Sequence, residues 1–319
     1  MPAVGDTLDF IVIGAQRSGT TSLWRYLDSH PAIHIPASKE APFFSHPTYA
    51  RGLSWYLAEY FADATPERYW GTVSPQYMMG SAAADEHELA RRIRVTVPDT
   101  KLIAVLRDPI ERARSQHTLN VHRGIEHREF GIAAEALLNP EALREARRPG
   151  AARRGYQRYL VAGEYGRILA AFLDEFPREQ LRVLLTDELA HSPAERVAEI
   201  FSYIGVDPAH APAGLDVRHN RGGRMRRLDG QAEAALKEYL SNEVWDKTRE
   251  PRLHERAFDF WFMEWNMIPD EHSDAIDPVL HARLRDHFAP DAERLERLLE
   301  QPIPWAHYAS GRTTSPGTR

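Results

Sequence analysis

Three short, unbroken runs of apolar residues mark the chain, and longer segments with helical spacing lie between them. The runs cover residues 8–14 (LDFIVIG), 101–106 (KLIAVL) and 181–185 (LRVLL). Each run is too short for a helix and too continuous for a strand with one face in water, which is typical of parallel strands buried on both faces. We therefore predict an α/β fold of three layers, in which helices flank a central parallel sheet.

Two of the flanking helices can be outlined from the pattern. Apolar residues recur at helical spacing over residues 165–176, so one face of this helix should be buried. The next helix is predicted to begin at Ser192, because Ser192 and Glu195 match a capping box, and to end near Gly205.

Composition narrows the possible functions. Lys plus Arg number 40 and Asp plus Glu number 46, so the net charge is −6 and we do not expect the chain to bind nucleic acid. There is no cysteine, which excludes disulfides, thiolate nucleophiles and cysteine-ligated zinc, and the 15 histidines form no recognised zinc motif. We expect no metal site. No apolar run reaches the roughly 20 residues of a membrane span, and no secretory signal is evident, so we predict a cytoplasmic protein.

No repeat or low-complexity linker divides the sequence. We therefore predict one domain over residues 1–310. The last segment, 311–319 (GRTTSPGTR), contains no apolar residue and is predicted to be a disordered tail.

The first apolar run continues into a glycine-containing turn, GAQRSGTTS, and then into a helical pattern. Gly14 and Gly19 have the separation of the phosphate-binding loop GxxxxGK[ST], although Thr20 stands where that motif has lysine. N–H groups at the start of the following helix attract anions. The side chains of the turn that can add to this attraction are those of Arg17, Ser18, Thr20 and Thr21. We predict an anion site here; the alternative is ordinary turn chemistry at a glycine before a helix.

A second basic residue follows the strand predicted over residues 101–106. Arg107 lies at the carboxyl end of that strand, where ligands bind in open α/β sheets. Pro109 is predicted to begin a helix, and Ser115, eight residues after Arg107, falls about two turns into it. The Ser115 hydroxyl can then help Arg107 hold one phosphate group. The alternative is that Arg107 forms a helix cap or a surface ion pair.

Together these segments resemble the sulfotransferases that use 3′-phosphoadenosine 5′-phosphosulfate (PAPS), particularly the branch with the heparan sulfate enzymes and many bacterial members. The resemblance covers most of the chain, in the segments GAQRSGTTSLWRYL, HPAIHIPASKEAPFF, GLSWYL, SPQY, KLIAVLRDPIERARSQH and LRDHFAPDAERLERLL. It implies a P-loop-like fold and a direct in-line transfer of the sulfuryl group, with PAPS as co-substrate and without a metal.

The resemblance also implies roles for single residues. Those that it assigns to the 5′-phosphosulfate are Arg17, Ser18, Gly19, Thr20 and Thr21. It assigns the 3′-phosphate to Arg107 and Ser115.

The segment KEAPFF resembles the part of these enzymes that carries the catalytic base, and its acidic residue is Glu40. A carboxylate can take the proton that an acceptor hydroxyl or amine loses as it attacks sulfur. The alternative is that Glu40 merely pairs with Lys39 or another surface cation. The chain departs from the related glycan enzymes at Thr72 and Val73, which replace a Glu-Lys pair whose lysine assists departure of the sulfuryl group. The assisting cation must come from elsewhere, and Arg17 is the first candidate and Lys39 the second.

Residues 217–227 (VRHNRGGRMRR) contain five arginines and no acid, and their Gly-Gly pair predicts a mobile loop. A comparable stretch in the bacterial relatives closes over the nucleotide. The resemblance therefore assigns the 3′-phosphate and adenine also to Asn220, Arg221, Gly223 and Arg224. The alternative is a solvated basic loop that balances nearby carboxylates.

The expected function is sulfuryl transfer from PAPS to a hydroxyl or amine of a small-molecule, glycan, glycolipid or natural-product acceptor, with Glu40 as general base. Two other functions stay open at this point. A P-loop kinase or NTPase would need an acid to hold magnesium, for which Asp108 is the one candidate. A binding module of the same fold without catalytic activity is also compatible with the replacement at Val73.

Overall fold

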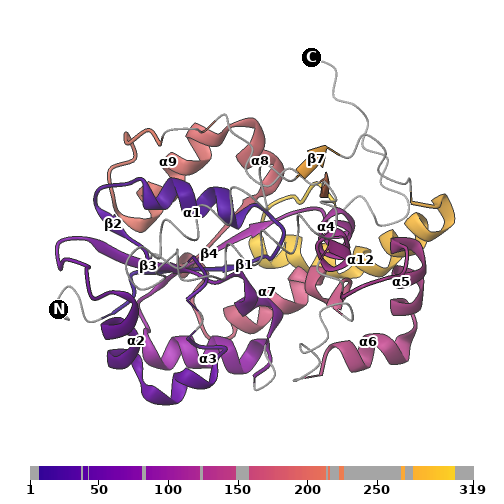
Figure 1. Ribbon diagram of the computed structural model, residues 1–319, viewed down its shortest axis with the longest axis horizontal. Helices are drawn as coiled ribbons and strands as arrows, with labels where there is room; N and C mark the ends of the chain where they lie inside the picture. Colours follow the sequence, from indigo (N-terminus) through magenta and orange to yellow (C-terminus); the bar gives the residue numbers. More distant parts are fainter. Residues whose placement is uncertain are drawn as a thin grey trace, which may run out of the picture.

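A computed structural model of the protein describes residues 7–36, 39–41, 43–80, 84–122, 125–148, 158–212, 215, 223–225, 267–269 and 276–305. Its centre is a five-stranded parallel sheet with the strand order β2-β3-β1-β4-β5 (Figure 1). The strands are β1 (Phe10–Gly14), β2 (Ile33–His34), β3 (Tyr69–Val73), β4 (Lys101–Leu106) and β5 (Leu181–Leu185). The predicted fold class is confirmed.

The apolar strands supply both faces of the sheet. Every residue of β1 is buried; Ile11 and Ile13 belong to one core cluster, whereas Phe10 and Val12 belong to the other. Successive side chains of a strand point to opposite faces, so one unbroken apolar run serves two cores. The predicted first strand is correct except that it begins at Phe10.

Helices cover both faces of the sheet (Figure 1). Those over the face of Phe10 and Val12 are α1 (Thr20–Asp28), α8 (Thr186–His191) and α9 (Pro193–Ile204). Those over the opposite face are α2 (Leu53–Tyr60), α3 (Glu86–Thr96) and α7 (Tyr165–Leu173), with α12 (Pro278–Leu299) packed on α7. The predicted helix over 165–176 is present as α7 and ends at Leu173.

The capping box predicted at Ser192 is wrong, although α9 does begin at the next residue and does end at Gly205. Ser192 makes no side-chain cap. Its N–H already donates to the carbonyl of Glu188 at the end of α8 (2.9 Å), so that N–H is not available to Glu195. Glu195 pairs with Arg196 instead of reaching back (3.0 Å).

The remaining described elements lie beyond the ends of the strands or join the layers. They are α4 (Pro109–His122), α5 (Phe130–Leu137), α6 (Pro140–Ala146), β6 (Gly223–Met225), β7 (Met267–Pro269) and the 3₁₀ helices η1 (Pro47–Arg51), η2 (Pro75–Met79), η5 (Val161–Gly163) and η6 (Arg178–Gln180). The segment 311–319, for which we predicted a disordered tail, lies outside the described residues.

Candidate functional site

The turn between β1 and α1 has the backbone of an anion-binding loop. Arg17 and Gly19 both adopt positive φ angles, 70° and 95°. Gly19 forms the N-cap of α1, and no side chain caps that helix end. The N–H of Ala15 donates to the carbonyl of Val105 in β4 (2.8 Å), so the turn is fixed to the neighbouring strand. The first N–H groups of α1 are therefore presented by a rigid turn, an arrangement that binds anions.

The side chains of the turn differ in their exposure. Ser18 is fully buried and its hydroxyl lies inside the protein, whereas Arg17 and Thr21 are half-buried. Thr20 is the first residue of α1 and is also buried. Arg17 and Thr21 are the better placed of these side chains to meet a ligand.

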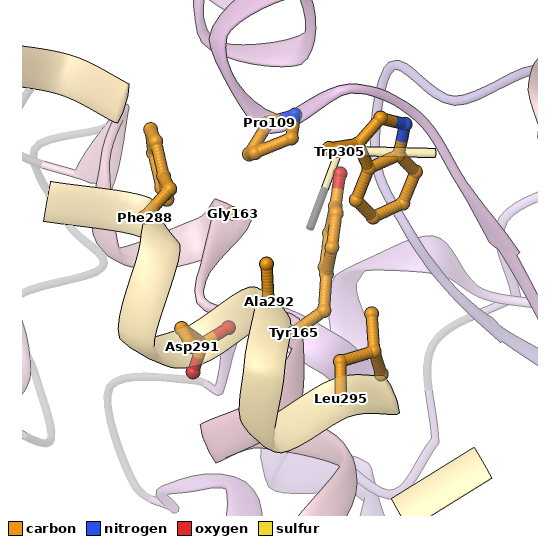
Figure 2. Close-up of a pocket in the computed structure, with 8 residues that line it drawn as sticks. All are labelled: Pro109, Gly163, Tyr165, Phe288, Asp291, Ala292, Leu295 and Trp305. Carbon is orange, nitrogen blue, oxygen red and sulfur yellow. The ribbon is translucent and has the colours of Figure 1, made fainter. Parts of the chain in front are cut away.

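Arg107 follows β4 and is about one-third exposed. Its Nη2 lies 3.4 Å from a carboxylate oxygen of Glu111, one turn along α4, so the ion pair considered as an alternative is present. The Tyr165 hydroxyl donates to the carbonyl oxygen of Arg107 (2.9 Å). Tyr165 stands between Pro109 and Trp305 at a narrow pocket (Figure 2). The hydrogen bond from Tyr165 thus fixes the backbone of Arg107.

Ser115 connects the two basic residues of the site. It lies in α4, as predicted, and its Oγ accepts a hydrogen bond from Nε of Arg17 (3.0 Å). In this structure Ser115 is therefore hydrogen-bonded to Arg17, whereas Arg107 is paired with Glu111. The bond brings the loop after β1 and the helix after β4 together at the carboxyl edge of the sheet, although 98 residues separate them in the sequence.

Asp108 caps α4. One of its carboxylate oxygens accepts from the N–H groups of Ile110 (2.9 Å) and Glu111 (3.0 Å). This is the ordinary role of Asp before a proline that begins a helix. Asp108, the residue that a kinase or NTPase would need for magnesium, thus caps a helix in this structure.

Sequence reasoning missed Thr186, the first residue of α8. Its Oγ1 is 2.7 Å from the carbonyl oxygen of Ser18 and 3.0 Å from that of Leu106. One hydroxyl thus joins the anion-binding turn to the ends of β4 and β5. Thr186 stands out only in the folded structure, where the ends of β1, β4 and β5 lie close together.

Sequence reasoning also missed Arg112, which is fully buried in α4. Its Nη2 donates to the carbonyl of Tyr159, while Nε and Nη1 have no hydrogen-bond partner among the described residues. Burial lowers the pKa of Arg112, and the positive charge of Arg107 adds to this effect.

Glu40 lies in the segment between β2 and η1, and its side chain is half exposed. Its Oε1 is 3.5 Å from Nζ of Lys39, so the pair considered as an alternative to catalysis exists. Because about half of the Glu40 side chain remains exposed beside Lys39, its carboxylate stays open to other partners.

The arginine-rich stretch 217–227 is described only in part. Gly223 and Arg224 belong to β6, which pairs antiparallel with β7 and whose backbone lies beside α4. For these residues the structure has a short strand where a loop was predicted, because Arg224 pairs with Ile268. Asn220 and Arg221 lie outside the described residues.

Neither a metal centre nor a membrane span is found in the described part of the chain. No group of three or more His, Asp or Glu side chains that could hold a metal ion occurs there. Among the same residues, no helix has the length and apolar character needed to cross a bilayer.

The chain matches the family model described as "Sulfotransferase domain" over residues 7–287. It is 31% identical over 208 residues to the bifunctional heparan sulfate N-deacetylase/N-sulfotransferase 3 of Homo sapiens, which covers 62% of this chain and 22% of that protein. It is 25% identical over 234 residues to the corresponding enzyme 1 of Caenorhabditis briggsae, covering 70% of this chain and 26% of that protein. The chain thus spans about a quarter of the length of these relatives.

A sulfotransferase from Alicyclobacillus acidocaldarius has a similar solved structure. The TM-score is 0.62 at 25% sequence identity, and the superposition covers 93% of this chain and 98% of that one. The family model takes in the whole central sheet, the loop after β1 and the helix after β4. The chain belongs to the sulfotransferase domain family.

Proposed function

We propose that this protein is a PAPS-dependent sulfotransferase that transfers a sulfuryl group directly to a hydroxyl or amine of its acceptor. The observation that carries the proposal is the Arg17–Ser115 hydrogen bond (3.0 Å), which joins two anion-binding elements at one edge of the sheet. A nucleotide with phosphate on both its 3′ and 5′ positions needs two such elements side by side. An NTP-binding loop needs only one.

The residues of the first loop fit a 5′-phosphosulfate. The uncapped start of α1 offers N–H groups, and Arg17 adds a cation that the Ser115 hydroxyl holds in place. Donors fixed in advance around the transferring group stabilise the charge that develops there, which can lower the barrier by several kcal/mol. Arg17 is therefore proposed to assist departure of the sulfuryl group from the nucleotide, with Lys39 as the second candidate.

The 3′-phosphate is proposed to bind Arg107 and Ser115. Arg107 is held through its backbone by Tyr165, and its guanidinium is paired with a half-exposed Glu111. Such a pair is weak, so a phosphate can replace or join it. The backbone of Gly223 and Arg224 beside α4 is compatible with a further contact to the nucleotide.

Glu40 is proposed to take the proton of the acceptor. Its carboxylate is half exposed, which is the accessibility that a group contacting an incoming substrate requires. The acceptor is proposed to be a glycan, lipid or small molecule with a hydroxyl or an amine. The named activity of the relatives on heparan sulfate favours testing amino sugars first.

The donor site is tested by calorimetric titration of 3′,5′-adenosine bisphosphate (PAP), AMP and ATP, each with and without magnesium. Magnesium-independent preference for PAP is the expected result. Preference for magnesium-ATP would overturn the proposal and favour a kinase.

The reaction is tested by transfer of radiolabelled sulfate from PAPS to a panel of amino sugars, polysaccharides, phenols and glycolipids. We expect Glu40→Gln to lower turnover by about two orders of magnitude with little change in the dissociation constant of PAP. Equal turnover in the two proteins would remove Glu40 from the mechanism. PAP binding without transfer to any acceptor would favour the non-catalytic binding module.

A further inference from the structure

The backbone just after Glu40 is held on both sides by tyrosine hydroxyls from two other elements. The N–H of Phe43 donates to Oη of Tyr77 (3.0 Å), and Oη of Tyr56 donates to the carbonyl oxygen of Ala41 (3.1 Å). Tyr77 belongs to η2 and Tyr56 to α2. Two hydrogen bonds from distant parts of the chain thus hold the backbone at Ala41 and at Phe43.

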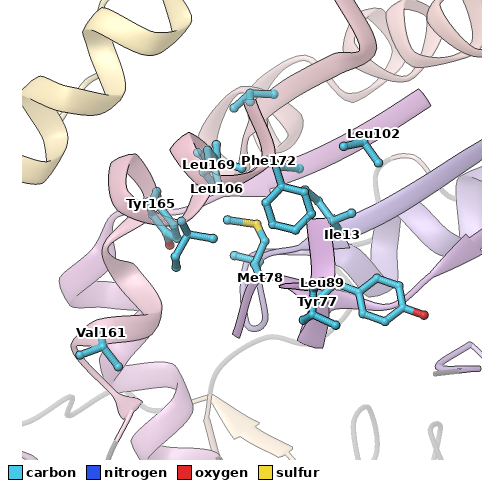
Figure 3. Packing of buried hydrophobic residues seen from close by; sticks show 14 of the residues in the cluster. Ile13, Tyr77, Met78, Leu89, Leu102, Leu106, Val161, Tyr165, Leu169 and Phe172 are labelled. Atoms are coloured by element: carbon cyan, nitrogen blue, oxygen red, sulfur yellow. The ribbon is translucent and has the colours of Figure 1, made fainter. Parts of the chain in front are cut away.

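Both tyrosines are fixed themselves. Each is fully buried. The Tyr56 ring stacks on that of Phe43 at 4.7 Å between centroids, and the Tyr56 hydroxyl is 3.3 Å from Oγ1 of Thr72 in β3. Figure 3 shows Tyr77 in the core with its hydroxyl directed away from the neighbouring Met78. The burial of both rings therefore restricts where their hydroxyls can lie, and each hydroxyl reaches the backbone beside Glu40.

The hydroxyls stay protonated over the working range of pH. Burial raises the pKa of Tyr56 well above its ordinary value, and the neighbouring Tyr77 adds to this shift. Burial likewise raises the pKa of Tyr77. Neutral phenols both donate and accept, as the contacts with Ala41 and Phe43 require.

The same elements are attached to the start of the anion-binding loop. The N–H of Ser74, which precedes η2, donates to the carbonyl of Val12 in β1 (2.9 Å). The side chain of Met78 lies so close to Gly14 that a Cβ on that glycine would come within 2.2 Å of the Met78 sulfur. Tyr77 is therefore part of a rigid connection from the loop to the segment of Glu40.

Glu40 has few constraints of its own. Its side chain is half exposed, and the described ion pair that it makes is a long one, with Nζ of Lys39 at 3.5 Å. The position of its carboxylate therefore depends on where the backbone of residues 39–41 is held. A misplacement of about 1 Å can cost a hundredfold in rate.

We propose that Tyr56 and Tyr77 are positioning residues, which hold the Glu40 segment at a fixed place relative to the anion-binding loop so that its carboxylate can meet the acceptor. This inference rests on the proposed function, because it assumes that Glu40 is the general base. Neither tyrosine is expected to touch the nucleotide.

The first test is independent of catalysis. The protein contains 12 phenylalanines, so selective ¹⁵N-Phe labelling gives a tractable set of amide signals. We expect Tyr77→Phe to speed hydrogen exchange of the Phe43 amide by about tenfold or more, since that N–H loses its acceptor. Tyr49→Phe is the matched control: its ring also contacts Phe43, at 5.3 Å, but its hydroxyl meets Thr96. An unchanged Phe43 amide in Tyr77→Phe would overturn the anchoring.

The second test measures the reaction with the acceptor that the wild type uses. We expect Tyr56→Phe and Tyr77→Phe each to lower kcat by about tenfold to a hundredfold, with the dissociation constant of PAP unchanged and Tyr49→Phe equal to wild type. In a double-mutant cycle, Tyr77→Phe should have little further effect on kcat when Glu40 is already Gln, because the two residues act through one group.

The outcomes separate the inference from the function on which it rests. A wild type that binds no PAP and transfers no sulfate refutes the proposed function, and the inference falls with it. An active wild type whose kcat is the same in Tyr77→Phe and Tyr49→Phe overturns the inference alone. Additive losses in the double-mutant cycle also overturn it, because they would show that Tyr77 acts independently of Glu40.

Discussion

Replacing Arg107 with alanine removes the guanidinium proposed to bind the 3′-phosphate. A hydrogen bond between charged groups contributes about 1.5–3 kcal/mol. Two features of the site reduce this value: Arg107 is about one-third exposed, and it leaves a pair with Glu111 worth about 0.3–0.5 kcal/mol. We therefore expect Arg107→Ala to weaken PAP binding by about 1–2.5 kcal/mol, which is about fivefold to seventyfold in the dissociation constant.

Calorimetry with two nucleotides checks the reason for this loss as well as its size. AMP lacks the 3′-phosphate, so its affinity should change less than about twofold. Arg114→Ala is the matched control, since Arg114 contacts the same Glu111 at the same 3.4 Å; this variant should bind PAP like the wild type. Equal losses for PAP and AMP in Arg107→Ala would refute the placement of the 3′-phosphate, as would an unchanged affinity for PAP.

Three further predictions concern stability. Burial raises the pKa of Asp291 from 3.8 to about 6 against the opposing effect of two backbone hydrogen bonds. Its stabilising contribution is thus complete below about pH 3.8 and is lost as pH rises through 6. Urea unfolding should therefore show the wild type losing roughly 2–2.5 kcal/mol relative to Asp291→Asn between pH 4 and 7, and a gain would contradict this. Glu164→Gln should cost about 1.5–3 kcal/mol in the same assay, because the buried Glu164 carboxylate accepts charged hydrogen bonds from the partly exposed Arg147 and Arg167. A cost below about 0.5 kcal/mol would refute that role. Gly71→Ala should destabilise the protein by about 3 kcal/mol or more, since its Cβ would lie 2.0 Å from the Phe10 ring. The control Gly131→Ala should be tolerated, because its Cβ would meet no atom closer than 3.7 Å. Equal melting temperatures of the two variants would refute this reasoning.

The strands that sequence identified share one property. Residues 101–106 and 181–185 are predicted correctly to the residue, because buried parallel strands are short and apolar on both faces. β3 was missed since Gly71 and Thr72 interrupt its apolar pattern (YWGTV). The structure explains both exceptions: the Phe10 ring fills the space beside Gly71, and the Thr72 hydroxyl meets that of Tyr56.

Sequence identified the charged groups of the site better than the groups that support them. Arg17 and Ser115 were singled out from a loop motif and a strand end, and the structure brings them into contact. Tyr165 and Thr186 act through backbone carbonyls, whose partners are not encoded by residue type. A tyrosine at helical spacing and a threonine after a strand resemble ordinary core and capping residues, so their role emerges only from the fold.

The surroundings of Thr72 and Val73 explain why this chain has neutral residues where the related glycan enzymes have a Glu-Lys pair. Val73 ends β3 with its side chain fully buried in the core under α1, and Thr72 faces the buried hydroxyl of Tyr56. A carboxylate or ammonium group at these fully buried positions would lose its hydration, which costs several kcal/mol unless a partner is supplied. The neutral pair is therefore consistent with its environment, and under the proposed function the leaving group needs a cation from another residue. Arg17, whose Nε is held by Ser115 at 3.0 Å, is the group that we expect to supply it. Arg17→Lys keeps the positive charge but loses the guanidinium that Ser115 holds. We therefore expect this variant to lose a larger factor in turnover than in its affinity for PAP, measured by sulfate transfer and by calorimetry.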